Sequence, residues 1–316
     1  MSQPNDQPND PDLSRGDELL QSFARGDAMI GLIADIPGAE KEMMDALWAA
    51  AGRHHSGAWT SIGDAHIARL RPVGAFEGVD VDGRGDAIWS EDARRIVDTE
   101  QPQLECALRA YFEASRLGDR AATMQLAKMC RYSNVDNKRI ARQTLEGLSD
   151  PTPGEVYQLG LVQNWLGDMD GSGKSHMSAA GRGDLDAQFE LFIYFTQGVG
   201  FEADEAQATA WLERAAAGSH PRALFNVGAA YATGKNGEPD LNKAAEYYER
   251  AAQHGNARAA ATLGVMMLTR EIDGTKEQAI SWLERADAAG YDTWEALDNA
   301  GVDDPRESSS DDEPDA

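Results

Sequence analysis

The chain has 316 residues, of which 41% are hydrophobic and 26% are charged, so it has enough apolar residues for a folded body larger than one small domain. Its 54 acidic residues outnumber its 29 lysines and arginines, which gives a formal net charge of −25. Such a charge repels nucleic-acid phosphates and anionic membranes, and it favours solubility or a basic partner.

The first residues lack a basic region followed by an apolar run, so they do not resemble a signal peptide. No stretch reaches the ~18 consecutive apolar residues of a membrane span. Cys106 and Cys130 are the only two cysteines and predict core thiols rather than a disulfide framework. Together these features predict a cytoplasmic protein.

The chain begins with a polar, proline-containing segment that predicts a disordered tail over residues 1–13. Apolar residues at helical spacing follow, and they predict an N-terminal helical cap with a degenerate repeat over 14–57. Residues 58–152 predict further degenerate helical repeats, interrupted by an insertion at 71–98. The same helical spacing continues over 153–292, where it becomes regular.

The insertion contains the one spacing that suggests a metal. Asp80, Asp82 and Glu91 stand at the first, third and twelfth positions of a calcium loop. Arg84 and Ile88, however, occupy positions that normally supply ligand oxygens, and a cation there opposes binding. A short β-hairpin or mobile loop around Asp82 is therefore the simpler prediction, with calcium binding as an alternative.

A five-residue segment, called a phrase below, recurs within residues 153–292. WLERA stands at 211–215 and 282–286, and YYERA stands between them at 247–251. Starts that lie 36 and then 35 residues apart predict a stacked structural unit rather than a catalytic motif. Within 221–256, one apolar helical face is followed by a Gly- and Pro-containing turn and a second apolar face, which ends at Gly255. One unit is therefore two helices and two turns.

The end of the chain predicts a short capping helix over 293–302 and a disordered acidic tail over 303–316. The tail combines a serine run with seven acidic residues. It contains too few apolar residues to offset the entropy lost on ordering the chain.

The segment ALFNVGAAYATGKNGEPDLNKAAEYYERAAQHGN resembles a Sel1-like repeat, a unit related to the tetratricopeptide repeat. The resemblance extends over 185–292 and, more weakly, over 153–184 and 58–152. It implies an all-α fold, namely a right-handed α-α solenoid of about five to six helix pairs with disordered acidic tails. It also implies a non-catalytic adaptor or regulatory role.

Other motifs do not indicate catalysis. Gly173-Lys174-Ser175 ends like a phosphate-binding loop, but Asp168 stands where the leading glycine belongs, and the motif follows a helix rather than a strand. His54, His55 and His66 are close in sequence but lack an evident third ligand. We therefore predict neither enzymatic activity nor a cofactor.

A solenoid of helix pairs presents the first helix of each unit on a concave face. In the tetratricopeptide pattern, ligands meet positions at fixed offsets from the Leu-Gly pair of that helix. Aromatic residues and arginine are common interface anchors, although the same positions can serve packing between units. When these offsets are applied to the repeats of this chain, they predict a set of protein-binding residues: Arg131, Tyr132, Tyr157, Asn164, Trp165, Phe189, Gln197 and Phe225.

Three functions remain open at this stage. The first is a scaffold that binds a partner protein, possibly a basic one, on the concave face. The second is a cytoplasmic immunity protein that neutralises a secreted, basic bacterial toxin. The third is a metal-responsive regulator that uses the 71–98 insertion.

Overall fold

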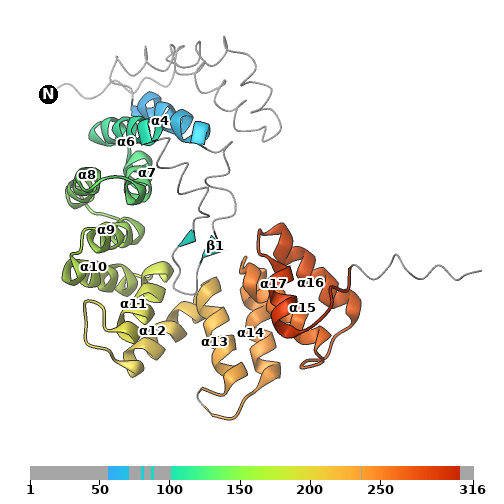
Figure 1. Cartoon of the computed structure of the whole chain (residues 1–316). Helices are drawn as coiled ribbons and strands as arrows, with labels where there is room; N and C mark the ends of the chain where they lie inside the picture. Colours follow the sequence, from blue (N-terminus) through green and yellow to red (C-terminus); the bar gives the residue numbers. More distant parts are fainter. Residues whose placement is uncertain (1–55, 71–79, 82–86, 89–100, 236, 307–316) are drawn as a thin grey trace, which may run out of the picture. The chain divides into compact units, whose positions relative to one another are not determined.

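The computed structural model describes residues 56–70, 80–81, 87–88, 101–235 and 237–306. These residues form an all-α array of helix pairs, which confirms the predicted fold class (Figure 1). The predicted tail 1–13, nearly all of the predicted cap 14–57 and the end of the acidic tail lie outside the described residues. The helices are α4 (Ser56–Leu70), α6 (Gln101–Arg116), α7 (Arg120–Met129), α8 (Val135–Glu146), α9 (Pro153–Trp165), α10 (Met169–Gly181), α11 (Leu185–Gln197), α12 (Glu205–Ala217), α13 (Pro221–Thr233), α14 (Leu241–Gln253), α15 (Ala257–Leu268), α16 (Lys276–Ala288) and α17 (Thr293–Ala300), with a 3-10 turn, η2, at Cys130–Tyr132.

The chain divides into two compact units, and the division falls inside α10, between Ser175 and His176. The N-terminal unit contains the helices from α4 to the first half of α10. The C-terminal unit contains the rest of α10 to α17, and residues 80–86 are grouped with it. The regular repeats predicted over 153–292 therefore start in one compact unit and end in the other.

Helices α4 and α6 form one repeat pair even though residues 71–100 separate them. A Cβ atom on Gly63 of α4 would lie 2.5 Å from the Tyr111 ring of α6. In the regular repeat, a Cβ atom on Gly228 of α13 would likewise lie 2.8 Å from the Tyr248 ring of α14. Glycine thus permits the same close approach of two helices in both places. The insertion occupies the position of the turn between them.

Two short strands within the insertion, β1 (Asp80–Val81) and β2 (Ala87–Ile88), pair in a two-stranded sheet. This pairing agrees with the β-hairpin that the sequence predicts around Asp82. Asp82 and Glu91 lie outside the described residues, so the alternative calcium loop of Asp80, Asp82 and Glu91 stays a prediction.

The repeat period is visible in the helix caps. The first helices of successive pairs begin after Asp184, His220, Asn256 and Asp292, whose side chains all accept a hydrogen bond from a backbone N–H of the first turn. These caps recur every 36 residues. Such side chains satisfy N–H groups that have no partner within the helix. The period therefore fixes where each helix starts as well as what it buries.

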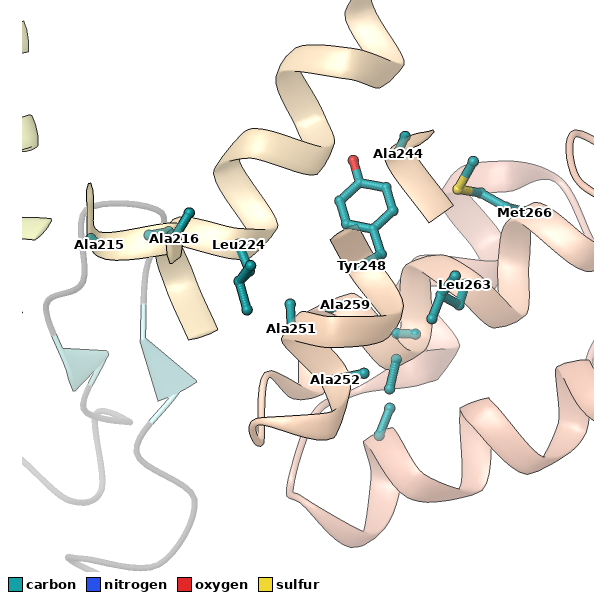
Figure 2. Packing of buried hydrophobic residues seen from close by; sticks show 14 of the residues in the cluster. Ala215, Ala216, Leu224, Ala244, Tyr248, Ala251, Ala252, Ala259, Leu263 and Met266 are labelled. Carbon is teal, nitrogen blue, oxygen red and sulfur yellow. The ribbon is translucent and has the colours of Figure 1, made fainter. Parts of the chain in front are cut away.

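The recurring WLERA and YYERA phrases lie on the second helices α12, α14 and α16. Their alanines Ala215, Ala251 and Ala286 are fully buried, and Trp211 is 8% exposed. Figure 2 shows Ala215 and Ala251 in the buried cluster. Small residues at these positions let neighbouring helices approach closely. The arginine of each phrase covers the aromatic ring one turn before it, which explains why the two recur together. The guanidinium-to-ring distances are 4.5 Å for Arg214 and Trp211, 5.3 Å for Arg250 and Tyr247, and 4.4 Å for Arg285 and Trp282.

The described residues extend beyond the predicted capping helix to Arg306. The Arg306 guanidinium donates hydrogen bonds to Asp304 and Asp287 and, at 3.0 Å, to the Thr293 hydroxyl. Residues 303–306, which the sequence places in a disordered tail, are therefore fastened to α16 and α17. The sequence gives little indication of this attachment, because a single arginine makes all of these contacts.

An ion pair between an exposed arginine and a buried glutamate joins the first helices of two repeats in the N-terminal unit. Arg120 at the start of α7 donates from Nε to the Glu155 carboxylate of α9 at 2.7 Å, and its Nη2 contacts the other carboxylate oxygen. The backbone N–H of Thr152 also donates to Glu155, at 2.7 Å, within a capping box. These bonds lower the pKa of Glu155 to about 2.

We expect Glu155→Gln to lower the free energy of unfolding at neutral pH by about 2 kcal/mol, because the variant keeps the shape but loses the charge-assisted bonds. The wild-type pair stabilises the fold above pH 4.5, and its contribution is lost as the pH falls from 4.5 towards 2. Urea denaturation across this range should show that loss only in the wild type. The control is Glu146→Gln, which removes a solvent-exposed partner of Arg142; an equal effect in both variants would contradict the prediction.

Candidate protein-binding surface

The predicted residues Arg131 and Tyr132 lie on the 3-10 turn that follows α7. Cys130 anchors this turn, because its side chain is fully buried and its backbone N–H donates to Leu126. The Ser133 hydroxyl donates to the Cys130 carbonyl at 2.8 Å and closes the turn. The turn therefore holds both side chains at the edge of the core that α7, α8 and α9 share.

The structure brings Arg131, Tyr132 and Trp165 together, and we call these three residues the Arg131 patch. The Arg131 guanidinium carbon lies 5.8 Å from the centre of the Tyr132 ring and 5.7 Å from the centre of the Trp165 ring. All three side chains are half-buried. A guanidinium beside two aromatic rings is attracted by their electron-rich faces, so the cation and the rings restrict one another's motion.

Helix α9 supplies Trp165 from its last turn. The helix starts at a capping box formed by Thr152 and Glu155, and Pro153 occupies its first position. Tyr157 and Asn164, also predicted as binding residues, are half-buried on the same helix. Trp165 lies against Arg131. The binding role of Tyr157 and Asn164 stays a prediction.

Phe189 and Phe225 occupy equivalent positions on the first helices α11 and α13 of the C-terminal unit. Phe189 is only 3% exposed, and its ring stacks on His220 with a centroid distance of 4.8 Å. It therefore serves packing between repeats, the alternative that the sequence left open. Phe225 is half-buried and packs against Tyr248, with ring centroids 5.2 Å apart.

Both phenylalanines are covered by an arginine from the next first helix. Arg222 lies 4.3 Å from the Phe189 ring centre, and Arg258 lies 5.0 Å from that of Phe225. The sequence prediction missed these arginines. Arg222 and Arg258 are 36 residues apart, so the repeat period could have identified them. The prediction used only fixed offsets from the Leu-Gly pair, and these offsets do not include the two arginines. Gln197, the remaining predicted residue, is exposed at the end of α11.

The segment that resembles a phosphate-binding loop is helical. Gly173, Lys174 and Ser175 all lie within α10, where the buried Ser172 hydroxyl donates to the Gly160 carbonyl at 2.7 Å and the Ser175 hydroxyl donates to Gln163 at 2.7 Å. Small residues here let α10 lie close to α9. A helix directs its N–H groups along its own axis and cannot cradle a phosphate in mid-course.

The described cysteine and the described histidine and acidic side chains show no sign of a reactive or metal-binding site. Burial raises the pKa of the Cys130 thiol to about 12, which keeps it protonated and unreactive at neutral pH. No group of three or more His, Cys, Asp or Glu side chains in the described ranges is placed to hold a metal ion. His54 and His55 lie outside those ranges.

None of the helices in the described part of the chain combines the length and apolar character needed to cross a membrane.

Comparison with known proteins gives a family match in the C-terminal unit. The Sel1 repeat family matches three times, at residues 185–220, 221–256 and 258–291. No curated protein matches the chain. Among solved structures, a Sel1 repeat protein from Oxalobacter formigenes is 33% identical and covers 40% of this chain and 96% of its own, with a TM-score of 0.37. A protective antigen present in uropathogenic Escherichia coli strains, which displays an SLR fold, is 19% identical and covers 90% of this chain and 66% of its own, with a TM-score of 0.44.

The family matches begin and end at the described repeats. The first match ends at His220, directly before α13 begins at Pro221. The second match ends at Asn256, the N-cap of α15. The three consecutive matched repeats assign residues 185–291 of this chain to the Sel1 repeat family.

Proposed function

We propose that this protein is a non-catalytic scaffold that binds another protein through the Arg131 patch. Sel1 repeats generally serve as protein-interaction scaffolds. The observation that carries the proposal is the position of the Arg131 guanidinium between the Tyr132 and Trp165 rings, with all three side chains half-buried. Arginine, tyrosine and tryptophan are the residues that most often dominate binding energy at protein interfaces.

Pre-organisation supports the use of this patch. A side chain that is already held against its neighbours loses less conformational freedom on binding than a mobile one. The 3-10 turn fixes the backbone of Arg131 and Tyr132, and α9 fixes Trp165. A partner that covers the patch therefore gains aromatic contact area without ordering a loop.

The test is affinity capture from the native host with the full chain, followed by quantitative mass spectrometry. We expect Arg131→Ala and Trp165→Ala each to reduce retention of the specific partner about tenfold or more, because truncated interface anchors commonly cost more than about 1.4 kcal/mol. The matched control is Arg250→Ala, which removes an arginine from an aromatic ring on the second helix α14.

Circular dichroism establishes that each variant is folded before the capture is compared. Full retention of the same partner by a folded Trp165→Ala variant would show that the Arg131 patch is not the binding surface. Equal loss in Arg250→Ala would show that arginine–aromatic contacts act only through stability.

A further inference from the structure

A pocket of about 310 Å³ opens between α12 and α13 in the C-terminal unit. Its apolar walls include Leu212 from α12 and Val227 and Tyr231 from α13. Two carboxylates complete it, Glu213 from α12 and Glu238 from the turn between α13 and α14. The volume lies at the small end of the range found for ligand sites in proteins, which starts at roughly 300 Å³.

The pocket exists because one repeat position is small. Ala230 lines it, whereas Met266 stands 36 residues later in the next repeat and is only 5% exposed there. A methionine is therefore buried at the equivalent position, whereas the shorter alanine side chain lines an open pocket. The pocket is thus a property of this repeat rather than a feature that the repeat pattern imposes.

The turn after α13 brings the second carboxylate to the pocket. Gly234 adopts a φ of +67°, and a Cβ atom on it would lie 2.7 Å from the carbonyl oxygen of Gly237. The Gly237 N–H donates to the Gly234 carbonyl at 3.1 Å, and the Asp240 N–H donates to Tyr231 at 2.9 Å. These bonds fold the turn back on the end of α13, so Glu238 lies beside the pocket.

The charged groups around the pocket leave both carboxylates available to a ligand. Within the described residues, neither Glu213 nor Glu238 takes part in a salt bridge. Lys235 instead pairs with Glu205 at 3.2 Å, and Lys243 lies 5.2 Å from the centre of the Tyr231 ring. A pocket that combines apolar walls with two exposed carboxylates is complementary to a long side chain with a cationic end.

We infer that this pocket binds the side chain of an arginine presented by a partner protein. The methylene stem lies along Leu212 and Val227, and the guanidinium pairs with Glu213 and Glu238. Arginine suits this site better than lysine, since the guanidinium is planar, more weakly hydrated and able to donate to two carboxylates at once. The ring of Tyr231 already stacks on Tyr247 at 5.5 Å, so the carboxylates rather than that ring face take the cation.

This inference goes beyond the proposed function, because it uses a different unit of the protein and names the chemistry of the ligand. It can be tested without the partner. The probe is a blocked Gly-Arg-Gly tripeptide, titrated into the isotopically labelled full chain while backbone amide resonances are followed by NMR. The comparison peptide carries citrulline, which has the shape of arginine without its charge.

We expect saturable shifts confined to α12, α13 and the turn around Glu238, with a Kd of about 1 mM for the arginine peptide. The citrulline peptide should bind at least about tenfold more weakly, which corresponds to one lost charge-assisted pair. Ala230→Met should abolish the shifts by filling the pocket, and Glu213→Gln should weaken binding about fivefold. The control Glu284→Gln changes the equivalent glutamate of WLERA in α16, which is exposed outside the pocket, and should bind like the wild type.

Equal binding of the two peptides, or shifts centred elsewhere, would overturn the inference. So would unchanged affinity in Glu213→Gln, a surface substitution that leaves the core intact. Failure of this test leaves the capture experiment on the Arg131 patch unaffected, and failure of that experiment leaves the arginine titration unaffected, so the two outcomes are distinguishable.

Discussion

Leu224→Ala is expected to lower the free energy of unfolding of the C-terminal unit by about 3 kcal/mol. Leu224 is fully buried on α13 and belongs to the cluster that contains Ala215, Ala216 and Ala251 (Figure 2). Many members of this cluster are alanines, whose short side chains cannot extend into the space that truncation leaves. The cavity left by truncation therefore stays open, and the cost exceeds the transfer free energy of the deleted atoms.

Urea denaturation followed by far-ultraviolet circular dichroism measures this effect. The control is Leu241→Ala, because Leu241 is a half-buried leucine at the start of α14 in the same core. Its loss should cost about 1 kcal/mol, in proportion to the smaller area withdrawn from water. If Leu224→Ala were no more destabilising than Leu241→Ala, the described packing of α13 would be incorrect.

Acidification from pH 6.5 to pH 4 is expected to destabilise the C-terminal unit through His176. This histidine is fully buried on α10, and its ring meets that of Tyr194 edge-on with centroids 5.3 Å apart. Burial lowers the pKa of His176 from 6.5 to about 4, because the apolar surroundings disfavour the charged imidazolium. The unfolded chain takes up the proton first, so stability is present above pH 6.5 and is lost as the pH falls towards 4.

The difference between the two pKa values corresponds to about 3 kcal/mol of stability lost across this range. His176→Leu removes the titrating group and should show a smaller pH dependence between pH 6.5 and 4. The control His254→Gln changes an exposed histidine at the end of α14 and should behave like the wild type. Parallel stability curves for wild type and His176→Leu would rule out a buried neutral histidine at this position. Glu155 acts in a lower range, below pH 4.5, so the two groups can be separated.

Much of the fold could be predicted because its determinants are local and periodic. The helix end at Gly255 was predicted from residue type and is confirmed, because α14 ends at Gln253 and Gly255 has a positive φ. Gly228 and Tyr248 lie in one repeat, so their contact follows from the unit itself. Small and aromatic residues at fixed positions are sufficient to specify a helix pair when each pair contacts only its neighbours.

The candidate surfaces were harder to predict, because they depend on contacts between helices of different repeats. The positions of Arg131 and Trp165 were predicted one by one, but the approach of the arginine to the two rings follows from the 3-10 turn after α7. Phe189 occupies the same repeat position as Phe225 but is more deeply buried, since His220 stacks on it. The pocket beside Ala230 carries no motif, because it results from the absence of a large side chain.

The sequence by itself determined the helix pairs, their period and the alanine and aromatic faces that they bury, because each of these depends on residue types at fixed separations along the chain. Only the tertiary structure decided that α4 pairs with α6 across the insertion, that an arginine covers Tyr132 and Trp165, and that two glutamates from different elements line one pocket. These features arise where side chains from separate helices fill, or fail to fill, a common space. Their geometry depends on the volumes of all the neighbours at once, and no spacing along the chain encodes that.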